Sequence, residues 1–420
     1  MKKTFSLLVF IIVLQSCQNA QQVQSKNNHK STKDNIIVLT DPKVNSEAAY
    51  LFNNGDKIIL NWTQRAEHDK KDNLLKFAVF NLDTGKFDSI MTVPSSKGLQ
   101  DHLETMAKVG LKKDGTLFAV YRKKLPTDRS RFGGLVYVVT SKDQGKTWSK
   151  EQRLVKDTTS TSQSFYDIAL LPNGNMSLTW LDSRSKRRGK TLYFAQTDAN
   201  NMFSQQKPVA FSTCECCRTD LYVDARGQIH IAYRNLIEPD EPGFDGNGFT
   251  EIRDMYYLKS VDTAKTFTQP VPISRDNWHV NGCPHTGPSL AYNGQKLGAI
   301  WFTGVQPQPG LYFTTKTDDQ AFLPRKSISI EGRHPQMIAL NGKYYAVYEF
   351  YYEKNGKGFY KIILNVIQPN GQHQIHEISK PLTQNNHPVL TQISKDQILA
   401  AWTNTDTRHP KIMYKIIDIK

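Results

Sequence analysis

The stretch Ser141-Lys-Asp-Gln-Gly-Lys-Thr-Trp148 decides the fold of this chain, because its residues suit a short turn between two antiparallel strands. An apolar, β-prone run over residues 135–140 comes before it, and a polar run follows it. The carboxylate of Asp143 can accept hydrogen bonds from the backbone of its own turn, and Gly145 can adopt a positive φ. Trp148 can then fold back onto the hairpin as a hydrophobic plug.

Weaker copies of this pattern occur elsewhere in the chain. Residues 260–267 keep the same spacing, with Ala264 in place of the glycine and Phe267 in place of the tryptophan. Residues 83–87 form a truncated copy, and two further fragments at 198–203 and 318–322 keep only the acid and the aromatic residue. Each copy follows a β-rich run, so the chain repeats one hairpin unit.

A longer repeat contains these copies. Each unit has an apolar strand, a tight turn, and a second strand that ends in Trp or Tyr. The turns are Asn54-Gly55, Asp114-Gly115, Asn173-Gly174, Arg226-Gly227, Asn293-Gly294, Asn341-Gly342 and Lys395-Asp396, and the aromatic residues are Trp62, Tyr121, Trp180, Tyr233, Trp301, Tyr348 and Trp402. Asn-Gly and Asp-Gly favour type I′ hairpin turns, which need a positive φ at both central residues. A repeat of about fifty residues with four short strands predicts a β-propeller blade.

We therefore predict an all-β chain with a single β-propeller over residues 35–420. The repeats predict seven blades, with six as the alternative. The last unit, residues 388–419, offers only three strands, whereas the run at residues 36–39 has no unit of its own. We expect this N-terminal run to supply the missing outer strand and close the ring, which removes an exposed sheet edge.

The N-terminal residues predict export and anchoring. Residues 1–16 have a positive start and an apolar core too short to span a bilayer, as in a signal peptide. The run Leu14-Gln-Ser-Cys17 resembles the lipobox of bacterial lipoproteins, in which the cysteine is lipidated; an ordinary secretory signal is the alternative. Residues 17–34 would then be the lipidated Cys17 and a polar, flexible tether. We expect a lipid-anchored protein of the bacterial cell envelope, on the outer membrane, facing the periplasm or the surface.

The chain is strongly basic, with 54 Lys and Arg against 39 Asp and Glu and a formal net charge of +15. This charge attracts anionic glycans, acidic lipids or polyanions, or it only reflects a lysine-rich solvated surface. Nucleic acid is not an expected partner, because the protein is exported and no basic–aromatic motif occurs. We expect the protein to be a monomer.

The repeat also predicts where a site would form. Alignment of the units on their turns places Arg218, His285, His334 and His387 at the starts of innermost strands in four consecutive blades. Arg234 and Glu349 come at the ends of second strands, which reach the same face. The residues predicted to line one mouth at the axis, as substrate-binding groups, are Arg218, Arg234, Arg333, Asp220, His285 and His334.

Four cysteines besides Cys17 concentrate near this face. In an exported protein an even number of cysteines predicts disulfides. A Cys217–Cys283 disulfide would join neighbouring strand starts and leave Cys214 and Cys216 to pair or to remain free. The alternative is a copper or zinc site, because thiolates and imidazoles suit these ions. Its candidate ligands are Cys214, Cys216, Cys217, Cys283 and His285.

From about residue 45 to its end, the chain resembles the sialidase superfamily of Asp-box (BNR) β-propellers. In particular it resembles bacterial exported proteins with a Cys-x-Cys-Cys stretch that are identified as exo-α-sialidases by similarity. The resemblance implies three arginines that bind a sialic acid carboxylate, and Arg218, Arg234 and Arg333 are the candidates. The chain lacks the Phe-Arg-Ile-Pro motif of the family, and its adjacent Tyr348 and Glu349 would point to opposite faces of a strand. No catalytic residue is assigned.

Three functions remain open on this basis. The first is a glycoside hydrolase of the exo-α-sialidase type that acts on anionic or sialylated glycans. The second is a non-catalytic propeller that binds a glycan, a peptide or a protein. The third is an envelope protein that binds copper or zinc through its cysteines. A fluorogenic sialoside separates the first from the others, and elemental analysis of the purified protein identifies the third.

Overall fold

The structure, a computed structural model, describes residues 35–419 apart from 67–69, 126–132, 186, 238–250 and 281. The predicted signal peptide, the lipidation site Cys17 and the tether lie outside the described residues. The described helices are two short 3-10 turns, Lys70–Asp72 and Pro94–Ser96. Neither of these is long and apolar enough to cross a membrane.

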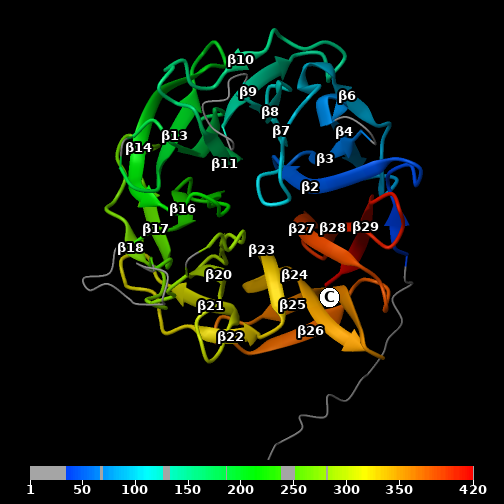
Figure 1. Ribbon diagram of the computed structural model, residues 1–420, viewed down its shortest axis with the longest axis vertical. Coiled ribbons are helices and arrows are strands. Elements are labelled where there is room, and N and C mark those ends of the chain that lie inside the picture. The colour runs from blue at the N-terminus through cyan, green and yellow to red at the C-terminus, as the bar shows by residue number, and fades with distance from the viewer. Residues whose placement is uncertain are drawn as a thin grey trace, which may run out of the picture. The chain divides into compact units, whose positions relative to one another are not determined.

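Seven antiparallel sheets follow one another as the blades of a β-propeller (Figure 1). Six sheets have four strands, and the first has a fifth, β6, beside its third strand. The first strand of each blade contacts the first strands of its neighbours around the ring, so these strands are the innermost ones. The prediction of an all-β chain with seven blades, and not six, is confirmed.

The strands of the first four blades are β2 (Asn45–Asn53), β3 (Ile58–Arg65), β4 (Leu74–Asn81), β5 (Lys86–Phe87) and β6 (Met91–Val93); β7 (Lys108–Leu111), β8 (Leu117–Lys124), β9 (Gly134–Ser141) and β10 (Gln152–Arg153); β11 (Gln163–Leu170), β12 (Met176–Asp182), β13 (Lys190–Thr197) and β14 (Phe203–Thr213); and β15 (Asp220–Val223), β16 (Ile229–Arg234), β17 (Met255–Ser260) and β18 (Val271–Pro272). The last three blades contain β19 (Ser289–Tyr292), β20 (Leu297–Thr303), β21 (Gly310–Lys316) and β22 (Lys326–Ser329); β23 (Gly332–Leu340), β24 (Lys343–Lys354), β25 (Lys357–Ile367) and β26 (His373–Glu377); and β27 (Asn385–Ser394), β28 (Gln397–Asn404), β29 (Lys411–Asp418) and β1 (Ile37–Val38).

The N-terminal strand closes the ring as predicted. In β1, Ile37 pairs with Tyr414 and Val38 with Met413, antiparallel to β29. The backbone N–H of Leu39 then donates to the carbonyl of Ile412 at 2.9 Å. The seventh blade therefore takes its outer strand from the opposite end of the described chain. This pairing covers a row of backbone groups that would otherwise form an open edge.

The repeated aromatic residues lie in the second strands and are part of the buried core. All seven are buried, and Trp180, Trp301 and Tyr348 have no exposed surface. Three of the indole N–H groups donate to side chains: that of Trp180 to Asp182 at 3.0 Å, that of Trp301 to Asp276 at 2.8 Å, and that of Trp402 to Asn385 at 2.9 Å. Aromatic burial of this kind stabilises the contacts between the strands of the core.

The repeated turns connect the first and second strands as predicted, but most are not type I′. Only Asn341-Gly342 has a positive φ at both residues, 52° and 74°. In four of the others the side chain of the turn's own Asn or Asp accepts a backbone N–H instead: Asn54 Oδ1 accepts from Lys57 N–H at 2.8 Å and Asn293 Oδ1 from Lys296 N–H at 2.8 Å, and Asp114 and Asn173 do the same. A side chain that caps its own turn removes the need for a left-handed first residue.

The hairpin around Ser141–Trp148 shows the hydrogen bonds expected of its sequence. Asp143 Oδ1 accepts from Thr147 N–H at 2.9 Å, and the hydroxyl of Ser141 accepts from Gly145 N–H at 2.9 Å. Gly145 has a φ of 87°. The indole of Trp148 packs edge-on against Phe77 with the ring centroids 6.1 Å apart, so the hairpin also ties the second blade to the first.

We predict that closure of the ring depends on the inward side of β1. Ile37 packs against the apolar cluster between the first and last blades, whereas the side chain of Val38 is 45% exposed. Ile37→Asp should therefore lower the free energy of unfolding by about 1–3 kcal/mol, because a buried apolar contact is replaced by a charge. Chemical denaturation measures the change.

The matched control is Val38→Asp, which should stay within about 0.5 kcal/mol of the native protein because it points to solvent. If both substitutions lowered the free energy of unfolding equally, the assignment of Ile37 to the buried face of β1 and of Val38 to the exposed face would be wrong.

Candidate functional site

Two histidines from neighbouring blades meet at the inner end of the sheets. His334 lies in β23 and His387 in β27, and each sits at an irregularity in the pairing of its strand. Their φ values are 51° and 47°, in the left-handed region that ordinary residues rarely adopt. A bulge changes the direction of a side chain relative to its strand. Here the two imidazole rings stack with their centroids 4.1 Å apart.

Glu349, near the middle of β24, holds both histidines. Its Oε1 lies 2.7 Å from Nδ1 of His334, and its Oε2 accepts the backbone N–H of His387 at 3.0 Å. The carboxylate is buried, while the side chains of the histidines keep 16% and 10% of their surface exposed. A buried carboxylate on Nδ1 fixes the ring and leaves Nε2 free to act on a ligand.

A second buried carboxylate, Glu104, completes the cluster from the second blade. Its Oε2 accepts from Gly287 N–H at 3.2 Å and lies 3.4 Å from Nε of Arg218, and its Oε1 lies 3.7 Å from Nε2 of His387. Gly287 is required at this position, because a Cβ there would lie 2.5 Å from the carbonyl oxygen of Arg218. Four blades thus meet at one carboxylate.

The environment moves the pKa values of the two histidines in opposite directions. Burial lowers the pKa of His387 well below its usual value, and the positive charges of His334, His102 and Arg218 lower it further. Burial also lowers the pKa of His334, but the charge of Glu349 and the hydrogen bond to it outweigh burial and raise the pKa. A pair of titratable groups with separated pKa values can supply a base and an acid together.

The structure brings some of the predicted mouth residues together and separates others. Arg218 and His334 join the same cluster through Glu104. His285 instead packs against His102, with the ring centroids 5.0 Å apart and the rings tilted by 36°. Asp220 accepts the backbone N–H of Leu290 at 2.8 Å between two blades. Burial, followed by the charge of Asp167, raises the pKa of Asp220 to about 7.

The three candidate arginines have separate partners. Arg234 is buried and donates to the backbone carbonyls of Arg253 and Phe302, both at 2.8 Å. Arg333 is exposed beside a depression of about 280 Å³ lined by Tyr351 and Tyr360, among others. Arg218 faces Glu104. The described residues therefore do not show three guanidinium groups converging on one carboxylate position.

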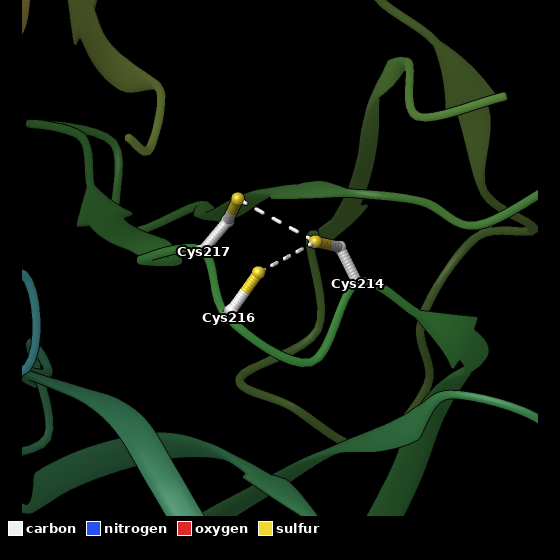
Figure 2. A group of neighbouring side chains, drawn as sticks. All are labelled: Cys214, Cys216 and Cys217. Carbon is white, nitrogen blue, oxygen red and sulfur yellow. Dashed lines mark hydrogen bonds between the residues drawn. The ribbon is translucent and has the colours of Figure 1, made fainter. Parts of the chain in front are cut away.

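The four cysteines near the mouth are free, so the predicted Cys217–Cys283 disulfide is wrong in this structure. Cys283 is exposed, whereas Cys214, Cys216 and Cys217 are buried in the loop between β14 and β15 (Figure 2). Cys214 Sγ lies 3.6 Å from Cys216 Sγ and 3.5 Å from Cys217 Sγ. The predicted disulfide assumed that Cys217 and Cys283 lie at neighbouring strand starts. It did not account for the β14–β15 loop, which brings Cys217 close to Cys214 instead.

Two groups among the described residues have ligand atoms within 4.8 Å of one another, as a metal ion requires. One is the three thiols, and the other is Glu104 with His334 and His387. Cys283 and His285, which were candidates for a copper or zinc site, belong to neither group.

Sequence reasoning missed Glu104. The only local signal was weak, because Glu104 stands in a polar stretch with Asp101 and His102 close by, and nothing in that stretch marks it for burial. The repeat alignment did not reveal it, since its partner Arg218 lies 114 residues away.

No family model matches this chain, and no curated protein matches its sequence. Its fold is similar to that of the polysaccharide lyase Uly1, at 12% identity over 96% of this chain and 96% of that chain, with a TM-score of 0.56. It is also similar to an ulvan lyase of family PL25, at 12% identity over 92% and 96%, with a TM-score of 0.58. The NanB sialidase from Streptococcus pneumoniae gives 10% identity over 90% and 68%, with a TM-score of 0.44.

These likenesses, at such low identity, concern the fold alone. The chain is a seven-bladed β-propeller whose structural neighbours include glycan-active enzymes.

We predict that Glu349 sets the protonation of His334. Glu349→Gln keeps the shape of the side chain but removes its charge, so burial should then dominate and the pKa of His334 should fall by about one unit or more. Titration of the imidazole signals by NMR, in protein with labelled histidine, measures this shift.

Glu353→Gln provides the control, because Glu353 lies on the same strand but its side chain is exposed. An unchanged pKa of His334 in Glu349→Gln would contradict the assignment of Glu349.

Proposed function

We propose that this mouth cleaves anionic polysaccharides by acid–base β-elimination at a uronate residue. The observation that carries the proposal is the stacked pair of His334 and His387, which lies between two buried carboxylates and has pKa values moved apart. A single imidazole pair can then offer a neutral base and a charged acid at one pH.

In the proposed step, neutral His387 takes the proton from C5 of the uronate. The electron pair of that C–H bond forms the C4–C5 double bond, and the C4–O glycosidic bond breaks. Protonated His334 gives its proton to the leaving oxygen. Since Nδ1 of His387 lies 3.4 Å from the acceptor Asn386 Oδ1, the tautomer with its hydrogen on Nδ1 leaves a lone pair on Nε2.

The two carboxylates favour histidine chemistry over hydrolysis by a carboxylate pair. Glu104 already accepts from Arg218 and from Gly287 N–H, and Glu349 is bound to both histidines. Hydrolases of sugars need one carboxyl group as acid and the other as nucleophile or base. Here both act as fixed negative charges, which position the histidines.

The substrate class is supported by charge and by likeness of fold. The net charge of +15 attracts polyanions. The exposed guanidinium of Arg333 adjoins His334 in sequence, beside an open depression with two tyrosines, where a carboxylate or sulfate group can pair with it. Among the proteins with similar folds, the ulvan lyase was also solved bound to a chain of glucuronate and sulfated rhamnose units, with a TM-score of 0.57.

We predict that the purified protein forms a C4–C5 unsaturated sugar from a sulfated, glucuronate-containing polysaccharide, detected by ultraviolet absorbance. His387→Ala should lower the rate by about 10²- to 10⁴-fold, the usual contribution of a general base. The profile of rate against pH should be bell-shaped and include pH 6.5, because His387 must be neutral above its lowered pKa and His334 charged below its raised pKa.

His376→Ala, on the exposed face of β26, is the control and should keep full activity. New reducing ends without the double bond would indicate hydrolysis and refute the elimination. Release from a fluorogenic sialoside would instead support the sialidase alternative. Loss of activity on exhaustive chelation would show that activity needs a bound metal ion, held either by Glu104, His334 and His387 or by the three thiols.

We also propose that Cys17 carries a lipid that anchors the protein in the bacterial envelope, on the outer membrane. The run Leu14-Gln-Ser-Cys17 before a polar stretch supports this proposal. The Cys17→Ala protein should leave the membrane fraction, whereas Cys283→Ala should remain in it. Membrane fractionation of the Cys17→Ala protein identical to that of the native protein would reject the anchor.

A further inference from the structure

Three thiols converge within four residues of the loop that joins β14 to β15. Cys214, Cys216 and Cys217 leave the end of β14 and point toward one another before β15 begins (Figure 2). Each is buried, at 1%, 7% and 1% exposure. A buried free cysteine alone is only a small apolar side chain. Three sulfur atoms directed at one point need a further explanation, because apolar packing does not require the sulfurs to meet.

The distances between the sulfurs suit a shared ion better than a disulfide. Cys214 Sγ lies 3.6 Å and 3.5 Å from the other two, and all three lie within 4.8 Å of one another. Thiolates around Zn²⁺ have bonds of about 2.3 Å, which in tetrahedral geometry separates the sulfurs by about 3.8 Å. Disulfide sulfurs lie only about 2.05 Å apart. The loop thus presents its thiols close to the spacing that a metal imposes.

The charge around the cluster also suits thiolates. One guanidinium nitrogen of Arg253 lies 3.1 Å from Cys214 Sγ and 3.8 Å from Cys216 Sγ. The other side of the same guanidinium donates to Glu251 at 2.8 Å, which holds it in place. A buried positive charge beside sulfur stabilises the deprotonated form that binds metals. The three cysteines also belong to a buried apolar cluster that includes Leu192 and Ile231.

We propose that Cys214, Cys216 and Cys217 bind one thiophilic ion, Zn²⁺ or Cu⁺, as three thiolate ligands. Soft sulfur ligands select these ions over hard cations. Binding replaces the thiol protons by the metal and releases them to solvent. Because Arg218 directly follows Cys217, the ion would also fix the loop that carries Arg218 to Glu104. This proposal does not depend on the polysaccharide chemistry of the mouth.

The test uses the full-length protein, reduced and purified without chelator. Elemental analysis should find about one zinc or copper ion per chain, and the metal that is found identifies the ion that the thiols bind. Titration of the metal-free protein with Zn²⁺, or with Cu⁺ under reducing conditions, should saturate at about one equivalent. Ultraviolet charge-transfer absorption should appear on Cu⁺ binding. Absence of binding for both ions would overturn the proposal.

Variants and thiol mapping locate the site. Cys216→Ser and Cys217→Ser should each lose the stoichiometric ion, while Cys283→Ser should keep it because Cys283 is exposed and outside the cluster. Loss of metal in Cys283→Ser would overturn the three-thiolate assignment. In native protein, bound metal should protect Cys214, Cys216 and Cys217 from alkylation but not Cys283, as read by peptide mass mapping. A mass two hydrogens lower in the Cys214–Cys217 peptide, the mark of a disulfide, would equally overturn it.

Discussion

Polar side chains on the innermost strands join the third, fourth, fifth and sixth blades in turn, and the mouth depends on these contacts. Asp167 Oδ2 accepts Leu221 N–H at 2.9 Å, and Asp220 Oδ2 accepts Leu290 N–H at 2.8 Å. In the following pair of blades the hydroxyl of Ser289 accepts the next strand's N–H at 3.0 Å. These bonds satisfy backbone donors that have no partner within their own sheet. They set the spacing of the strands that carry the mouth residues.

Burial of unpaired charges in the mouth would destabilise the fold, and this requirement for pairing fixes the positions of the charged side chains. The charges of Arg218 and Glu104 are almost fully removed from water, so each requires the other. Glu349 in turn stabilises a charged His334, while His387 stays neutral. The same low-dielectric surroundings that make an unpaired charge costly give these contacts their effect on pKa.

The thiol cluster and the mouth are neighbours in sequence as well as in the fold. Cys217 ends the cluster and Arg218 begins the mouth, within the connection from the third blade to the fourth. Arg253 and Arg234 have different partners in this region: Arg253 donates to Cys214 Sγ, and Arg234 donates to backbone carbonyls. The arginines of this face thus support the structure in three different ways, and a shared ligand is not needed to explain Arg234.

The sequence alone determined the repeat, because hairpins, buried aromatic residues and alternating strands are local features. Ser141–Trp148 and the seven aromatic positions followed from spacing within about fifty residues, and the closing strand at Ile37 followed from the strand missing in the last unit. The tertiary structure alone decided which charges meet. Glu104 pairs with Arg218, which lies 114 residues away in the sequence. Arg234 donates to backbone carbonyls, and Cys283 is exposed. These outcomes depend on how neighbouring blades approach at the axis and on which buried groups must be paired, and neither is encoded in local spacing.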